Sequence, residues 1–310
     1  AEYNHAFWKS FRKAVKEANP QALILAEHYG DPSGWLQGDE WDSIMNYDAF
    51  MEPVTWFLTG MEKHSDEMRE ELRGNADHFM GTMSHHMANM LVPSLLTSMN
   101  QLSNHDHSRF LTRTNHVVGR VEHLGPEAAN EFVEPAVMRE AAAFQMTWIG
   151  SPTIYYGDEA GVCGFTDPDN RRTYPWGRED KEMIAFHREL IKIHKTYQAF
   201  RTGALQMLLW EEHLLAYGRF LGEEQLVVVL NNKDELTEVT VPVWKAEVPV
   251  KGRMKRLIYS GEKGYTTEYE EYLICDGELV VNMGAHSVLI AVTLKEEEIE
   301  ETFPIETKET

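Results

Sequence analysis

Hydrophobic residues in the first part of the chain alternate between helical and strand-like spacing. From His5 to Asn19, apolar side chains recur three or four positions apart, which predicts an amphipathic helix that ends before Pro20. Leu23 to Ala26 and Ser43 to Tyr47 are short apolar runs that predict strands. Helix and strand patterns in this order indicate parallel βα units.

The alternation continues to about residue 200. Helical spacing is expected near positions 53 to 73 and 76 to 90. About four strands accompany the helices, which are too few to close an eight-stranded barrel, and a half barrel would leave apolar sheet edges bare. The later elements are an apolar, strand-like run from Leu91 to Leu102, a helix from Ala136 to Trp148, a strand from Thr153 to Tyr156 and a helix from Glu179 to Lys195.

Beyond Phe200 the apolar residues alternate with period two, and turns become frequent. Such runs predict an antiparallel β-sandwich of about 95 residues. The tail from Lys295 is acidic and is expected to be solvated. The expected strands include Leu214 to Arg219, Leu226 to Leu230, Leu236 to Val243 and Ser287 to Val292.

The net charge of the chain limits the kinds of partner that it can bind. With 50 acidic and 29 basic residues, the formal charge of -21 would repel phosphate backbones and anionic lipid. We therefore expect no nucleic acid and no membrane partner, and a neutral ligand instead. No apolar run approaches the roughly 18 residues that span a bilayer.

The cysteines and the first residue add two further expectations. Cys163 and Cys275 fit no metal or redox spacing and are expected to be free thiols, with one disulfide as the alternative. The sequence opens on Ala1 without a signal-like segment. We expect a piece of a longer polypeptide whose location the sequence leaves open, with the cytoplasm slightly favoured over secretion.

Two carboxylates follow apolar, strand-like runs. Glu27 comes after the run that ends at Ala26, and Asp106 comes after the run that ends at Leu102. Side chains beyond the ends of parallel strands lie at the rim of a sheet, where a pocket can form and a pKa can be tuned. Two such carboxylates are the minimum set for splitting a glycosidic bond.

Four motifs in the same order resemble the α-amylase superfamily. The added segment Asp167-Pro168-Asp169-Asn170-Arg171 resembles its neopullulanase and cyclomaltodextrinase branch. Each motif alone is weak, but four in order are specific, and the resemblance covers nearly the whole chain. The motifs are Ala26-Glu27-His28, Gly38 to Tyr47, Ser103 to Arg109 and Gly150 to Glu159.

This resemblance implies an α/β fold in three parts. Residues 1–200 would form the later half of a (β/α)8 TIM barrel, residues 201–295 an antiparallel β-sandwich domain, and residues 296–310 an acidic tail. In that family a Gly-x-Arg-x-Asp segment ahead of the first helix supplies the nucleophilic Asp. By the alignment of Ala1 to Trp8, this Asp would lie just before Ala1, so the chain is expected to be inactive alone.

The resemblance also assigns roles to individual residues. A retaining glycosidase needs a proton donor and a nucleophilic carboxylate about 5 Å apart. Glu27 matches the acid and base, and Asp106 resembles the carboxylate that grips sugar hydroxyls and stabilises the transition state. The implied sugar-binding residues are His105, Asn104, Asp167, Arg171, Tyr29, Trp35 and Tyr47, the last three by stacking on pyranose rings.

Several of these residues also fit structural roles. Asp167 and Arg171 can form a purely local ion pair, and the aromatic residues can be core residues, with Trp35 expected to be the most exposed. A metal cluster at His105-Asp106-His107 is disfavoured, because neighbouring side chains diverge and no further ligand follows at a usual spacing. Structural roles are also favoured for Arg109, Asp158-Glu159 and His85-His86.

The expected reaction is retaining hydrolysis of α-1,4 bonds, with α-1,6 bonds as a further linkage, in maltooligosaccharides, cyclodextrins, pullulan or starch. The alternatives are a transglycosylase or isomerase with the same sites, and a non-catalytic carbohydrate-binding relative. No cofactor is evident, and calcium is left to segments outside this chain. Expected partners are the α-glucan and either the missing N-terminal half or a second copy in a homodimer.

Overall fold

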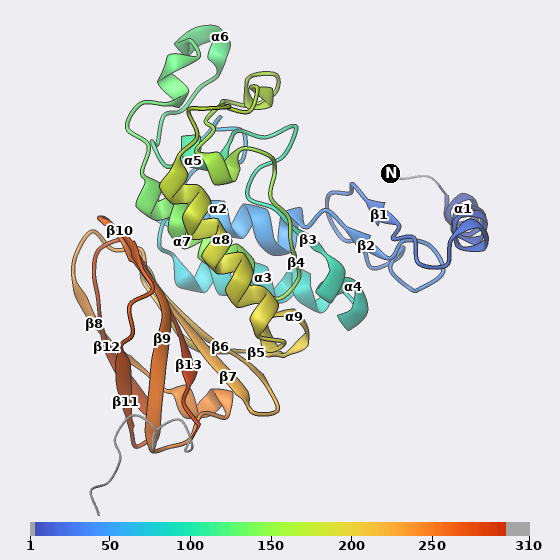
Figure 1. Cartoon of the computed structure of the whole chain (residues 1–310). Helices are drawn as coiled ribbons and strands as arrows, with labels where there is room; N and C mark the ends of the chain where they lie inside the picture. The colour runs from blue at the N-terminus through green and yellow to red at the C-terminus, as the bar shows by residue number, and fades with distance from the viewer. Residues whose placement is uncertain (1–3, 296–310) are drawn as a thin grey trace, which may run out of the picture.

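The computed structural model describes residues 4–295, which form two packed lobes (Figure 1). The first lobe combines helices with short parallel strands, and the second is an antiparallel sheet. In the described part, no helix is long and apolar enough to cross a membrane. The helices are α1 (His5–Ala18), α2 (Glu52–Thr59), α3 (Ala76–Ala88), α4 (Val92–Thr97), α5 (Phe110–Arg113), α6 (Val121–Leu124), α7 (Pro135–Thr147), α8 (Lys181–Thr196) and α9 (Ala199–Thr202), with a π-helical turn η1 (Tyr47–Met51). The strands are β1 (Leu25–Ala26), β2 (Ser43–Ile44), β3 (Met99–Asn100), β4 (Ser151–Pro152), β5 (Ala204–Glu211), β6 (Leu214–Leu221), β7 (Glu224–Asn231), β8 (Thr237–Val241), β9 (Gly252–Gly261), β10 (Gly264–Thr266), β11 (Glu271–Cys275), β12 (Glu278–Met283) and β13 (Ser287–Thr293).

The strands β1 to β4 of the first lobe run parallel in chain order. β1 pairs with β2, β3 pairs with β4, and a parallel bridge between Met45 and Met99 joins the two pairs. Helices α2 to α4 lie between β2 and β3 in the chain, and α5 to α7 lie between β3 and β4. Because all four carboxyl ends lie at one edge, residues that follow β1 and β3 come close together in space.

Buried amide side chains hold these short strands together. Asn46 Nδ2 donates to Asn100 Oδ1 at 2.8 Å, and Asn100 Nδ2 donates to the Ile149 carbonyl at 2.9 Å. Gln145 Nε2 donates to the carbonyls of Asn100 and Thr153 at 3.0 and 2.9 Å. Strands of two residues make few ladder hydrogen bonds, so this connected set of amides supplies much of the cross-strand pairing.

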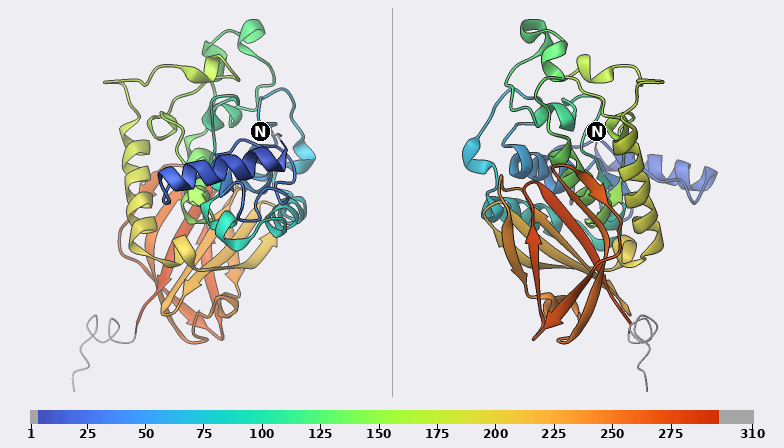
Figure 2. Two further views of the ribbon diagram at one scale, coloured as in Figure 1. Left: turned by 90° about the vertical axis from the view of Figure 1, so that its right-hand side faces the viewer. Right: turned by 60° about the vertical axis from the view of Figure 1, so that its left-hand side comes forward.

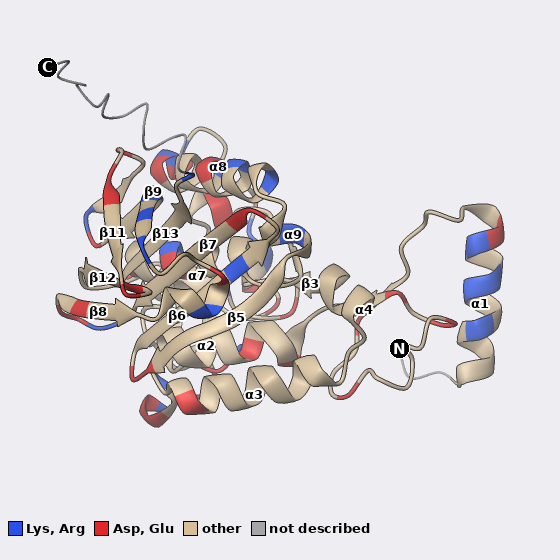
Figure 3. Ribbon diagram, turned by 90° about the horizontal axis from the view of Figure 1, so that it is seen from below, with Lys and Arg blue, Asp and Glu red and all other residues tan. Residues whose placement is uncertain are grey.

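Helix α1 lies at the outer end of the first lobe, beside β1 and β2 (Figure 1). The predicted helix from His5 to Asn19 is confirmed, with Asn4 as its N-cap. Basic residues recur along the helix (Figure 3). Among them, Arg12 and Lys16 both contact Asp42, at 2.6 and 2.9 Å, and tie the helix to the segment before β2.

Three predicted elements of the first lobe have other boundaries in the structure. The tract near 53 to 73 is not one helix, because Gly60 adopts a left-handed conformation with φ 68° and ends α2 at Thr59. The run from Leu91 to Leu102 contains helix α4 before it reaches β3. The strand expected from Thr153 to Tyr156 is displaced to β4, after which the chain turns through Gly157, with φ 91°.

The second lobe has the strand order β5-β6-β7-β13-β9-β11-β12-β8, with β10 on β9. The expected strands near 214, 226, 236 and 287 are confirmed as β6, β7, β8 and β13, except that Val243 begins a 3-10 turn. Strands β5 and β9 to β12 are not among the expected strands. In β9, β11 and β12, many positions carry polar side chains at partly or fully exposed sites. Cys163 and Cys275 are both free thiols, as expected.

The sheet is covered on both faces where it meets the helices. In β7, Val227 and Val229 pack inside the folded sheet against residues of β8, β12 and β13. The alternate residues Leu226, Val228 and Leu230 pack in the other core, which includes residues of α7 and α8. Two buried faces explain why β7 reads as a continuous apolar run and not as an alternation. Figure 2 shows the sheet beneath the helices.

Buried polar contacts also join the lobes. Arg139 of α7 donates to Ser260 Oγ of β9 at 2.8 Å. Arg219 of β6 donates to the Thr147 carbonyl at 2.7 Å, and the Thr147 hydroxyl lies 2.6 Å from the Tyr217 hydroxyl. Each of these contacts satisfies a polar group that water cannot reach, so separating the lobes would break paired groups as well as apolar packing.

Glu140 of α7 is buried at the junction of the lobes, 3.9 Å from Nδ1 of His286. Burial raises the pKa of Glu140 well above its usual value, Arg73 opposes this rise, and the nearby Glu134 adds to it. The folded chain therefore holds this proton more tightly than the unfolded chain. Ionisation of Glu140 consequently costs stability as the pH rises above the unfolded pKa of about 4.3.

We expect Glu140→Gln to raise the free energy of unfolding near neutral pH by about 1–3 kcal/mol, because the amide does not ionise and so removes the advantage that ionisation gives to the unfolded chain. Near pH 3, below the pKa of the carboxyl in both states, the two proteins should differ little. Urea unfolding across this pH range measures the difference, with Glu122→Gln in the exposed part of α6 as the control. Equal stability of both variants at neutral pH would contradict this account.

Candidate active site

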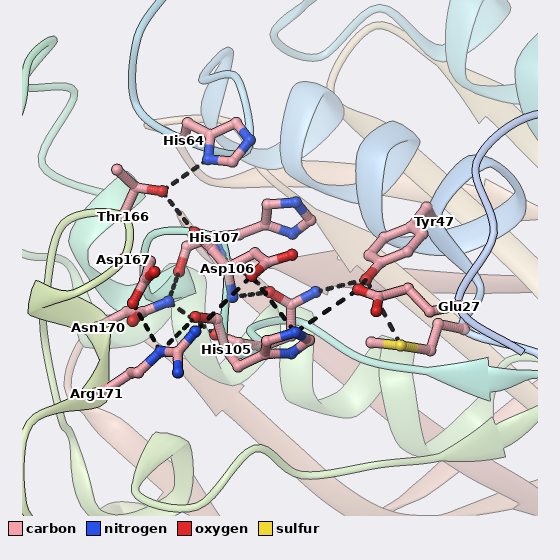
Figure 4. A network of polar contacts seen from close by, with 12 residues as sticks. Glu27, Tyr47, His64, His105, Asp106, His107, Thr166, Asp167, Asn170 and Arg171 are labelled. Atoms are coloured by element: carbon pink, nitrogen blue, oxygen red, sulfur yellow. Dashed lines mark hydrogen bonds and ion pairs between the residues drawn. The ribbon is translucent and has the colours of Figure 1, made fainter. Parts of the chain in front are cut away.

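Glu27 and Asp106 meet at the carboxyl edge of the parallel strands (Figure 4). Glu27 follows β1 directly, and Asp106 lies in the loop after β3. His105 stands between them, with Nε2 at 3.7 Å from Glu27 Oε1 and 3.4 Å from Asp106 Oδ1. The side chains of Glu27, His105 and Asp106 are 43%, 43% and 40% exposed, so the cluster is open to a ligand.

Tyr47 is a buried hydrogen-bond partner of Glu27. Its hydroxyl donates to Glu27 Oε1 at 3.1 Å and accepts from Asn104 Nδ2 at 3.1 Å. Burial, then the neighbouring Tyr29 and Glu27, raises the pKa of Tyr47, so the hydroxyl keeps its proton and remains a donor. The expectation that Tyr47 stacks on sugar is wrong, since its ring is 0% exposed and Tyr29 covers one face at a centroid distance of 4.3 Å.

The loop that carries His105 and Asp106 is fixed by buried amides. Asn104 Oδ1 accepts the backbone N–H groups of Asp106 and His107, both at 2.9 Å. Asn170 Nδ2 donates to the carbonyls of Asn104 and His107, at 3.0 and 2.7 Å. Asn104 is therefore placed to orient the loop, and Asn170 is a positioning residue that the spacing of the sequence did not reveal.

His107 lies behind the cluster, not within it. Its ring meets the Tyr47 ring edge-on at 5.3 Å, and its Nε2 lies 3.2 Å from the Tyr29 hydroxyl. Burial, reinforced by the charge of Arg113, lowers the pKa of His107 to about 2, so the ring is neutral at ordinary pH. The expected divergence of His105 and His107 is confirmed.

Asp167 and Arg171 form an exposed ion pair beside Asp106. Arg171 Nε lies 2.7 Å from Asp167 Oδ1, and Arg171 Nη2 lies 3.9 Å from Asp106 Oδ1. Arg171 Nε also donates to the His105 carbonyl at 3.0 Å. The local pair that the sequence allowed is thus present, and it lies close enough to the cluster to contact a ligand bound there.

The remaining aromatic candidates differ in exposure. Tyr29 is 45% exposed, and Lys63 Nζ lies 5.0 Å from its ring centroid. Trp35 is only partly exposed and stacks on the buried Trp41 at 5.1 Å, beside His28 at 4.9 Å. The expectation that Trp35 would be the most exposed is wrong, because indole packing with Trp41 gains more than a solvent position would.

Arg109 and Asp158 form a buried pair beneath the loop. Arg109 Nη1 donates to Asp158 Oδ1 at 3.0 Å, and its Nε donates to the Asn170 carbonyl at 2.9 Å. Burial raises the pKa of Asp158, and the Arg109 charge opposes that rise. The structural roles expected for both residues are confirmed, since Arg109 connects Asp158 to the residue that braces the loop.

A parallel βα segment with carboxylates beyond the carboxyl ends of its strands defines the class of catalytic (β/α) barrels. The chain belongs to the α-amylase family, whose description reads "Alpha amylase, catalytic domain" and which matches residues 2–213. The predicted α/β fold class is confirmed: the later half of a (β/α)8 barrel is followed by an antiparallel β domain.

Individual relatives agree with this family. The chain is 36% identical to neopullulanase 2 of Thermoactinomyces vulgaris over 250 residues, which is 78% of this chain and 37% of that protein. It is 31% identical to a cyclomaltodextrinase of Thermoanaerobacter pseudethanolicus, over 88% of this chain and 43% of that protein. A solved cyclomaltodextrinase structure superposes with a TM-score of 0.76 and 26% identity, over 94% of this chain and 44% of that one. The chain thus spans less than half the length of these relatives.

We expect Asn170→Ala to lower the free energy of unfolding by about 1–3 kcal/mol, because it leaves two buried carbonyls without their donor. Chemical denaturation measures the loss. Asn89→Ala, at the partly exposed end of α3, is the matched control and should change stability by less than about 0.5 kcal/mol. Equal effects of the two substitutions would show that Asn170 does not brace the loop.

Proposed function

We propose that this chain forms the acid/base side of an active site that hydrolyses α-glucosidic bonds by a retaining mechanism. The observation that carries the proposal is the convergence of Glu27, His105 and Asp106 at the carboxyl edge of the parallel strands. Relatives named neopullulanase, cyclomaltodextrinase and amylopullulanase support α-glucans as substrates. The proposed bonds are α-1,4, with α-1,6 as a further linkage.

Glu27 is proposed as the general acid and base. As an acid it protonates the departing glycosidic oxygen, and as a base it then removes a proton from the water that releases the sugar. The Tyr47 hydroxyl bonds to Glu27 Oε1, which leaves Oε2 as the oxygen that faces the substrate. Tyr47 thereby sets the direction from which the proton is delivered.

Asp106 and His105 are proposed to hold the sugar at the bond that breaks. Asp106 accepts hydrogen bonds from ring hydroxyls, and its negative charge stabilises the positive charge that develops on the ring. His105 bonds the same sugar from between the two carboxylates. Arg171 and Asp167 contact the next sugar, and Tyr29 offers the exposed ring on which a pyranose can stack.

The retaining mechanism also needs a nucleophilic carboxylate about 5 Å from the acid. By resemblance to the family, we propose that this residue belongs to an upstream segment that completes the site. We expect the 310-residue chain alone to hydrolyse cyclodextrin or maltotriose no faster than its Glu27→Gln variant does. Release of reducing sugar measures this, and appreciable hydrolysis that depends on Glu27 would contradict the proposed division of the site.

Joined to the upstream barrel strands of its family, the chain should be active. In that protein, Glu27→Gln should lower kcat by roughly 10²–10⁴-fold, because proton transfer to the leaving oxygen is lost. Glu122→Gln is the control, and kcat on maltotriose is the measurement. An unchanged kcat for Glu27→Gln would favour the alternative of a non-catalytic carbohydrate-binding relative. Products longer than maltotriose would instead favour the transglycosylase.

A further inference from the structure

The cluster at the carboxyl edge also combines the donor types of a metal site. Glu27, His105 and Asp106 each present one ligand atom, and these atoms lie within 4.8 Å of one another. Zinc binds nitrogen and oxygen at about 2.0–2.2 Å, and a tetrahedral arrangement sets such donors about 3.4 Å apart. Two of the three separations, 3.7 and 3.4 Å from His105 Nε2, are close to that value, and the third, between Glu27 and Asp106, lies within 4.8 Å.

From sequence alone, a metal cluster at His105-Asp106-His107 is disfavoured, because neighbouring side chains diverge and no further ligand follows at a usual spacing. In the folded chain His107 does point elsewhere, into contact with Tyr29 and Tyr47. The third donor comes instead from Glu27, which belongs to a different strand end (Figure 4). The long sequence separation hid a set of three ligands that the parallel strands bring together.

The donors are also held in place. The Asn104 and Asn170 amides fix the backbone of the loop that carries two of the ligands, and the Tyr47 hydroxyl fixes one oxygen of Glu27. Hydrogen bonds to the ligating residues orient them and strengthen the binding of the metal. All three ligand side chains are about two fifths exposed, which leaves room for water at a fourth position.

Charge and donor type narrow the choice of ion. Two carboxylates and a neutral imidazole carry a charge of about -2, which a divalent ion balances. Calcium prefers six to eight oxygen donors, whereas an imidazole with two carboxylates suits zinc. Arg171 lies 3.9 Å from Asp106 Oδ1 and opposes a cation, but its charge is already paired with Asp167 at 2.7 Å.

We propose that Glu27, His105 and Asp106 form a Zn²⁺ site at which the ion competes with a sugar for the same two carboxylates. The metal site rests on donor geometry, and the competition with a sugar rests on the proposed function. An ion held by Glu27 Oε1 and Asp106 Oδ1 lies between the two carboxylates, where the sugar would otherwise bind. Zinc therefore acts as a reversible blocker of this site, with no part in the chemistry.

Isothermal titration of Zn²⁺ into the 310-residue chain tests the proposal without any measurement of activity. One zinc ion per chain should bind, at least tenfold more tightly than Ca²⁺ in the same non-coordinating buffer. His105→Gln and Glu27→Gln should each weaken zinc binding by at least tenfold. The double variant His85→Gln/His86→Gln is the matched control, because it removes the adjacent histidine pair on α3, whose rings lie 5.0 Å apart, and should leave the affinity unchanged.

Circular dichroism and the unfolding midpoint establish that each variant is folded. Absence of zinc binding, or equal affinity in His105→Gln and the wild type, would overturn the proposed site. Loss of binding in the His85→Gln/His86→Gln variant would move the site to α3 and also overturn it. Zinc binding in a chain that never hydrolyses glucan, even when joined to its upstream strands, would leave this site intact and refute only the proposed function.

Discussion

The first lobe depends on the buried amides that hold its parallel strands together. Asn46, Asn100 and Gln145 link β2, β3 and β4 through side-chain hydrogen bonds, where the strands themselves are only two residues long. Unpaired amides would be costly at these buried positions, so each group stabilises one arrangement of the strands. The alignment of the strand ends, and with it the meeting of Glu27 and Asp106, follows from this pairing.

A second set of buried amides holds the loop that follows β3. Asn104 and Asn170 fix the loop beyond β3, and Arg109 connects that loop to the buried Asp158. The exposed cluster thus stands on a polar network that is itself buried. Groups that must bind a ligand remain open to solvent, while groups that set their positions are shielded from it, which is how a rigid site can be built on a loop.

Much of the fold could be predicted from sequence because its signals are local. Helical spacing located α1, α7 and α8, and apolar runs located β6, β7 and β13. Motif order identified the family and pointed to Glu27 and Asp106. The positions of Trp35, Tyr47 and Asn170 could not be predicted, since each depends on tertiary contacts. Trp35 stacks on Trp41, and the Tyr47 ring is covered by Tyr29. Asn170 bonds to carbonyls of another loop.

Strands β7 and β13 are buried on both faces. The β lobe therefore shares a hydrophobic core with the helices, although the pattern of the sequence changes near residue 200. A boundary near residue 200 separates two patterns along the chain, yet residues on alternate sides of β7 belong to two different cores. If the chain were cut at that boundary, one hydrophobic face of the sheet would be exposed to water. The β lobe therefore supports the helices, and its apolar residues must pack against those helices as well as against one another.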